Sequence, residues 1–138
     1  MIVLVNVDNE AESTFAEDNE RNIYNWLVAL LIENQYIIPD RTSIDSFLSE
    51  LRIQSSNMTE AELASLGGFF NARMIMTVNV TIPESYKRII EVKINDIESS
   101  QVYHTNQVLG TKMDPIWVLD KILELLPQGN RNSSYAAC

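Results

Sequence analysis

The chain has 138 residues, of which 46% are apolar and 21% charged, and its formal net charge is −9. A chain of this length is expected to form one domain, which could bury roughly 68–70% of the surface of the unfolded chain. The excess of acids argues against a nucleic-acid partner, because phosphate binding depends on clusters of lysine and arginine that this sequence lacks. It also disfavours docking on an anionic membrane surface.

Three features bear on the compartment of the protein. The longest apolar run, residues 26–32, is far shorter than the ~20 residues that cross a bilayer, so no transmembrane segment is predicted. Residues 1–10 lack the basic start of a signal peptide, so the protein is either cytosolic or trimmed of an export segment. The single cysteine, Cys138, allows no internal disulfide and gives no information on the compartment.

The first half of the chain is predicted to alternate strands with helices. Residues 2–7 are apolar at nearly every position, as in a buried strand, and the acidic segment 8–20 is predicted as a solvated loop. Thr14 and Glu17 have the spacing of a capping box, so a helix is expected to start there and to run to about Gln35. Its inner face is marked by an apolar stripe: Ile23, Trp26, Leu27, Leu30 and Leu31.

Residues 36–39 are predicted as a second short strand, ended by a proline that cannot donate to a sheet ladder. Thr42 with Asp45 is expected to cap a second helix. Thr59 with Glu62 has the spacing of another capping box, which opens a third helix.

The second half changes to strand spacing. In residues 74–81 and 86–94 the even and the odd positions carry different sets of side chains, as expected for the two faces of a strand. Residues 102–108 are predicted as a further strand. The short connections between them predict an antiparallel three-strand meander. Asp114 is then expected to cap a last helix that stops at Pro127.

The predicted order of elements is therefore β-α-β-α-α-β-β-β-α. The fold class is α/β in the broad, α+β sense: a mixed β-sheet with helices packed on one or both of its faces. Residues 1–127 are expected to form a single domain, and residues 128–138 a disordered tail.

The residues that usually carry catalysis are scarce. The only histidine, His104, lies in a predicted strand, and the only cysteine is terminal, so no activated nucleophile beside a base is predicted. One histidine and one cysteine cannot make a zinc site, and the one Gly-Gly pair lacks the lysine of a phosphate loop. We therefore expect no catalytic, cofactor-binding or metal-binding residue, and a role in binding or assembly.

Three stretches, residues 36–56, 63–80 and 86–102, carry a resemblance to a known family. They resemble the family of the curli-secretion lipoprotein CsgG, which includes the N-terminal domain of TolB and the lipoprotein activators of penicillin-binding proteins. The resemblance spans about residues 2–109. The matching positions, called signature residues below, are Asp40, Arg41, Glu50, Gln54, Leu66, Gly67 and Ala72, together with Asn71 in place of a glycine.

Two signature residues lead to predictions about structure. Asparagine is the most tolerant residue after glycine for a left-handed backbone, so the turn at Asn71 is expected to survive. Arg41 stands at a strand-to-helix junction, where it could bind carbonyls or an acid such as Glu50, worth roughly 1–3 kcal/mol. The alternative is a ligand-binding arginine. The structural interpretation is favoured, because a junction offers free carbonyls and no pocket is evident in the sequence.

The resemblance implies a non-catalytic domain of the cell envelope, periplasmic or associated with the outer membrane. Its partners would be other envelope proteins in assembly, secretion or peptidoglycan-synthase activation, and a homo-oligomer is left open. The candidate interface residues are Trp117, Val118 and Leu125 on the last helix. One alternative is a soluble ring-forming subunit of a secretion-type complex. Another is a small-molecule-binding or enzymatic domain with carboxylate chemistry.

Overall fold

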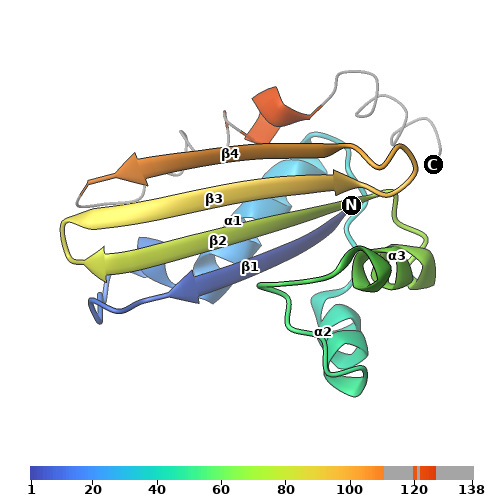
Figure 1. Ribbon diagram of the computed structural model, residues 1–138. Helices are drawn as coiled ribbons and strands as arrows, with labels where there is room; N and C mark the ends of the chain where they lie inside the picture. Colours follow the sequence, from blue (N-terminus) through green and yellow to red (C-terminus); the bar gives the residue numbers. More distant parts are fainter. Residues whose placement is uncertain (111–119, 121, 127–138) are drawn as a thin grey trace.

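The computed structural model describes residues 1–110, 120 and 122–126 and has a mixed four-stranded sheet with helices packed on it (Figure 1). The predicted α+β fold class is confirmed. The elements run in the order β1 (Ile2–Asp8), η1 (Ala16–Asp18), α1 (Glu20–Glu33), α2 (Arg41–Glu50), α3 (Glu60–Phe69), β2 (Met74–Glu84), β3 (Lys87–Asp96) and β4 (Val102–Leu109). Residues 122–125 are helical as well.

The sheet follows the order of the strands along the chain, β1-β2-β3-β4. β1 and β2 are parallel, because the helices between them return the chain to the same end of the sheet. The next two pairs are antiparallel and form the predicted meander, which is therefore confirmed. In Figure 1, β1 lies at one edge of the sheet and β4 at the other.

The two faces of the sheet are covered to different extents. One face packs over most of its length against α1 and against Ile122 and Leu126 near the C-terminus, and these contacts form the larger hydrophobic core. The other face packs against α2 and α3 mainly through the buried residues Ile2, Leu4 and Ile75, where β1 and β2 begin. Figure 1 shows α1 behind the sheet and α2 and α3 gathered at one end of it.

The strand predicted at residues 36–39 is wrong. This segment leaves α1 as extended chain without sheet pairing, and the ammonium group of Met1 donates a hydrogen bond to the carbonyl of Ile37 at 2.7 Å. The side chain of Tyr36 is buried in the larger core. The burial of Tyr36 thus holds the segment in place, and a short apolar run of this kind has the same pattern as a strand.

The start predicted for the first helix is also wrong. The helix α1 begins at Glu20, and the side chain of Asn19 accepts a hydrogen bond from the backbone N–H of Asn22. The residues ahead of Asn19 form the short 3-10 helix η1 instead, so Thr14 and Glu17 lie before the helix start.

Of the other two predicted caps, the one of α2 is wrong and the one of α3 is confirmed. Asp40, rather than Thr42 with Asp45, caps α2, because its carboxylate accepts a hydrogen bond from the N–H of Ser43. In α3 the capping box of Thr59 and Glu62 is present in both directions and is confirmed. The start of the last predicted helix, at Asp114, lies outside the described residues. None of the described helices is long and apolar enough to cross a membrane.

Candidate functional site

The uncovered half of the second sheet face, called the open face below, carries mostly polar side chains. On β2 and β3 the side chains that point to it include Asn79, Glu91 and Lys93, and on β4 they include His104 and Asn106. Successive side chains of a strand point to opposite faces of the sheet, so the neighbours of these residues along each strand point toward the larger core.

A row of hydrogen bonds crosses all four strands on this face. The hydroxyl of Ser55, which precedes α3, donates to Asn6 Oδ1 at 2.8 Å, and Asn6 Nδ2 donates to Asn79 Oδ1 at 3.0 Å. Asn79 Nδ2 then donates to Glu91 Oε1 at 3.3 Å, and Glu91 Oε2 lies 3.2 Å from His104 Nε2. We call these five residues the polar row.

The sheet register produces this row. Asn6 is the register partner of Asn79, and Asn79 is the register partner of Glu91. Burial raises the pKa of Glu91, but the hydrogen bonds from Asn79 and His104 outweigh it, so the pKa lies below its ordinary value. Glu91 is therefore ionised at neutral pH and acts as a fixed acceptor in the middle of the row.

A groove of about 230 Å³ lies beside the polar row, between the sheet and the chain that leads into α3. Glu91 and Lys93 give it both signs of charge, and Met58 and Leu63 give it an apolar wall. It is smaller than the usual pocket of a drug-sized ligand, which measures about 300–1,000 Å³. Its remaining lining residues are Ser55, Ser56, Asn57, Glu60, Thr77, Asn79, Asn95 and Val102.

The hydroxyl and the imidazole of the polar row each contact a different partner. The hydroxyl of Ser55 donates to Asn6, while His104 contacts Glu91, so this hydroxyl and this base are not hydrogen-bonded to each other. Within the described ranges, no three His, Cys, Asp or Glu residues gather in a way that could hold a metal ion.

Three phenylalanines form an aromatic cluster at the surface of α2 and α3. The ring centroid of Phe47 lies 4.7 Å from that of Phe69 and 5.8 Å from that of Phe70. Phe69 remains 69% exposed, and Leu51, which follows the last residue of α2 and lies four positions after Phe47, is exposed as well. Exposed aromatic side chains of this kind are typical anchors of protein interfaces.

The structure places Arg41 in a local cluster at the start of α2. Its guanidinium lies 3.2 Å from Glu20 Oε1, 3.6 Å from Asp45 Oδ2, and 4.5 Å from the ring centroid of Tyr24. The acids that contact it are therefore Glu20 and Asp45, rather than Glu50. The structural interpretation of Arg41 stays a prediction, with Glu20, Asp45 and Tyr24 as the observed neighbours.

Gly67, Asn71 and Ala72 form the turn from α3 to β2. Asn71 adopts a φ of 52°, as its tolerance of the left-handed region predicted. The N–H of Ala72 donates to the carbonyl of Gly67 at 2.8 Å, and a Cβ on Gly67 would lie 3.0 Å from the carbonyl oxygen of Ala72. These contacts describe the turn, and the structural role of the signature residues stays a prediction.

The remaining predicted residues do not join this site. Glu50 and Gln54 are exposed on and after α2. Leu125 is partly buried against the larger core, and Trp117 and Val118 lie outside the described residues. Their assignment to an interface stays a prediction.

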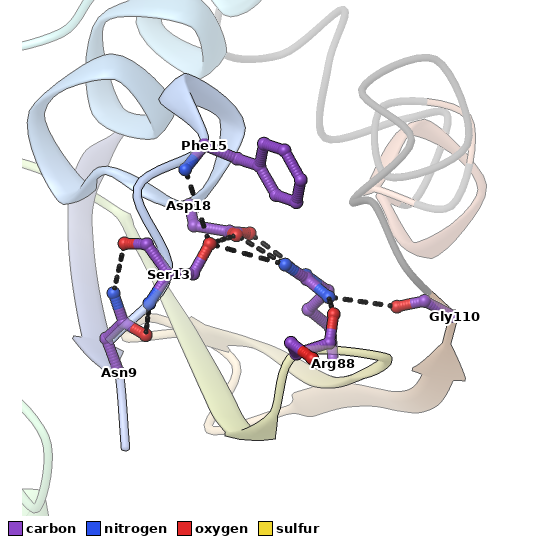
Figure 2. A network of polar contacts seen from close by, with 7 residues as sticks. Asn9, Ser13, Phe15, Asp18, Arg88 and Gly110 are labelled. Carbon is purple, nitrogen blue, oxygen red and sulfur yellow. Dashed lines mark hydrogen bonds and ion pairs between the residues drawn. The ribbon is translucent and has the colours of Figure 1, made fainter. Parts of the chain in front are cut away.

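Sequence reasoning missed a buried ion pair, which Figure 2 shows. Arg88 at the start of β3 is fully buried, and its Nη2 lies 2.6 Å from Asp18 Oδ2, while its Nε lies 3.1 Å from Asp18 Oδ1. Arg88 Nη1 donates to the carbonyls of Ser85 at 2.5 Å and Gly110 at 3.2 Å. The hydroxyl of Ser13 donates to Asp18 as well.

This ion pair ties the loop before α1 to β3 and to the end of β4. Burial raises the pKa of Asp18, but the hydrogen bonds from Arg88 and Ser13 outweigh it, so the pKa lies below its ordinary value. One signal in the sequence could have identified Arg88: it falls on the same side of its strand as the apolar Ile90, Val92 and Ile94.

No protein-family model matches the chain, and no curated protein matches it in sequence. Solved structures do share the fold. The LpoB C-terminal domain from Salmonella enterica superposes with a TM-score of 0.56 at 10% identity, covering 78% of this chain and 81% of that chain. The LpoB C-terminal domain from Escherichia coli gives 0.52 at 12% identity, with the same coverage of both chains.

Lipoprotein GNA1162 from Neisseria meningitidis gives a TM-score of 0.53 at 11% identity and covers 89% of this chain and 92% of that chain. At these identities the likeness shows a shared fold. The chain thus has an LpoB-like fold, as the resemblance to the lipoprotein activators implied. The likeness to CsgG and to the N-terminal domain of TolB stays a prediction.

Proposed function

We propose that the chain is a non-catalytic, protein-binding domain of the bacterial cell envelope, whose partner docks on the open face. The shared fold supports the compartment, because one of the structures with this fold is named as a lipoprotein and two are LpoB domains. The domain would act in envelope assembly, secretion or peptidoglycan-synthase activation, located in the periplasm or at the outer membrane.

The polar row is the observation that carries the proposal. Ser55, Asn6, Asn79, Glu91 and His104 are held by hydrogen bonds to one another, across segments far apart in the sequence. Side chains that are ordered before a partner arrives lose less conformational entropy on binding. A surface with this order suits recognition of a polar partner segment.

The aromatic cluster would complete such an interface. Interfaces combine apolar and aromatic anchors with polar surroundings, and a few anchors carry most of the binding free energy. The α3 helix joins the two surfaces, since Leu63 in α3 lines the groove and Phe69 in α3 belongs to the cluster. We expect a partner that offers an apolar side chain to Phe69 and polar groups to the groove.

Site-directed photo-crosslinking in the source cells tests the proposal. A photoreactive amino acid in place of Lys93, at the groove, is expected to trap one envelope protein, whereas the same amino acid in place of Glu33, exposed at the end of α1, is not. The crosslinked product should weaken at least fivefold with Phe69→Ala and persist with Ile32→Ala, a matched exposed position on α1. Equal crosslinking from both positions would contradict the open face as the docking surface.

The compartment needs its own measurement. Fractionation of the source cells is expected to place the native chain with the envelope, and its intact mass is expected to exceed that of the 138 residues because the chain is acylated. Recovery from the cytosol at the mass of the 138 residues would contradict the envelope proposal and leave the similarity as one of fold.

A further inference from the structure

The strand β4 lacks the protection that edge strands usually carry. Natural proteins blunt an exposed sheet edge with charged residues, prolines or bulges. Residues 99–111 contain no Lys, Arg, Asp, Glu or Pro, in a chain with 21% charged residues. The pairing of β4 with β3 runs without a register shift.

The outer edge of β4 presents a regular set of backbone groups. The N–H of Asp96 donates to the carbonyl of Gln101 at 2.9 Å, so β4 residues with odd numbers turn their peptide groups toward β3. Val102, His104, Asn106 and Val108 therefore turn theirs outward. Among the residues that the structure describes, no strand pairs with this edge. The side chains of these four residues are exposed on the open face.

We propose that β4 pairs antiparallel with β4 of a second copy of this chain, about a two-fold axis at Thr105. Opposed residues of an antiparallel pair share a face, and outward peptide groups must meet outward peptide groups. An axis at Thr105 satisfies both conditions. It sets Val102 opposite Val108 of the second copy, and His104 opposite Asn106 of the second copy.

The two valines favour this register over its neighbours. Val102 is 54% exposed and Val108 58% exposed, and they stand three residues on either side of Thr105. With the axis at Thr105, the dimer contains two Val102–Val108 pairs, one on each side of the axis. An axis at Asn106 would instead oppose Val108 to His104 and Val102 to Gly110, and it would leave the apolar side chains without apolar partners.

The pairing would join two four-stranded sheets into one continuous sheet. Because the two-fold axis is perpendicular to the sheet, both open faces would lie on the same side, with a groove on each half. The copies repel each other through a net charge of −9 each, while the contact itself carries no acid. Salt screens this repulsion, so the dimer is expected to tighten as ionic strength rises.

Light scattering on the purified full chain, over a range of concentrations, tests the proposal. We expect a mass of twice the chain's 15.7 kDa at high concentration. Val108→Lys should weaken dimerisation at least tenfold, while Ile32→Lys, at a position on α1 with similar exposure, should leave it unchanged. Thermal unfolding of both variants checks that each remains folded. A monomer at all concentrations, or a dimer lost only with Ile32→Lys, would overturn the proposal.

Disulfide trapping tests the register. In a Cys138→Ser background, Thr105→Cys is expected to crosslink to itself under mild oxidation, because non-hydrogen-bonded pairs bring Cα atoms to about 4.5 Å, within disulfide range. Ser49→Cys, exposed on α2, is the control and should stay reduced. Crosslinking through Asn106→Cys alone would overturn the axis at Thr105. Equal crosslinking through Ser49→Cys would overturn the strand pairing.

Discussion

Two arginines hold two junctions of this fold in different ways. Arg41 opens α2 and contacts Glu20, Asp45 and the ring of Tyr24 in a partly exposed cluster. Arg88 opens β3 and is fully buried, and it is paired with Asp18. Both guanidiniums bind a carboxylate near the start of α1, so the difference between them is mainly one of burial.

Burial changes what each ion pair contributes. Water and salt screen an exposed pair, which typically contributes 0 to about 1 kcal/mol. A buried pair need not add net stability, but removal of one partner leaves a desolvated charge and costs about 3–5 kcal/mol. The network around Arg88 is therefore expected to be the more sensitive of the two.

The largest expected effect comes from Asp18→Ala. The substitution leaves the guanidinium of Arg88 buried without its carboxylate, and the free energy of unfolding is expected to fall by about 3–5 kcal/mol. Denaturation with urea, followed by circular dichroism, measures the loss. Glu10→Ala, at an exposed acid in the same loop, should change stability by less than about 0.5 kcal/mol. Equal losses from both variants would remove the contrast between the two arginines.

A double replacement tests whether that loss comes from the buried charge left without its partner. Arg88→Met combined with Asp18→Leu removes both charges and keeps apolar volume, so the double variant is expected to recover about 1–3 kcal/mol relative to Asp18→Leu alone. The carbonyls of Ser85 and Gly110 still lose a donor, so full recovery is not expected. Strictly additive losses in the four-variant cycle would mean that the two side chains act independently.

The next largest effect is expected from acid, which should weaken the ion pair of Asp18 and Arg88. The pKa of Asp18 is lowered in the folded state, so its contribution is complete above its unfolded pKa of about 3.9 and is lost as the pH falls through the lower folded pKa. Unfolding free energies measured between pH 5 and pH 2 are expected to fall less steeply for Asp18→Asn than for the parent chain. Identical slopes would show that other carboxylates, such as Asp96 beside Arg73, account for the acid sensitivity.

The smallest effect is expected at Arg41. Arg41→Ala should lower the unfolding free energy by about 1 kcal/mol at low salt, and by less at about 1 M salt, because its ion pairs with Glu20 and Asp45 are partly exposed. Arg21→Ala, at an exposed arginine on α1, is the matched control and should have almost no effect. An unchanged stability in Arg41→Ala would argue against the structural interpretation of Arg41.

Local patterns predicted the features that local physics controls. The capping box of Thr59 and Glu62, the left-handed Asn71 and the meander each depend on neighbours within a few residues or on short connections. Two predicted caps were replaced by neighbouring residues, Asn19 and Asp40, whereas the strand predicted at residues 36–39 was overruled by contacts with distant parts of the chain. Residues 36–39 have the composition of a strand, but the sheet offers them no neighbour and Tyr36 is anchored in the core instead.

The candidate site was outside the reach of such patterns. His104 was predicted as a strand residue, yet its position at the end of a hydrogen-bonded row needs the register of β1, β2, β3 and β4 together. The uncovered half of the sheet likewise depends on α2 and α3 packing mainly where β1 and β2 begin. Neither fact is encoded in the spacing of any single segment.

The sequence by itself determined the α+β class, the type of most elements and the positions of the turns, because periodicity and capping arise from interactions between near neighbours. Only the tertiary structure decided that Arg88 meets Asp18, 70 residues away, and that Asn6, Asn79 and Glu91 lie side by side. Those contacts form when the chain closes long loops and aligns its strands, so they depend on the whole fold.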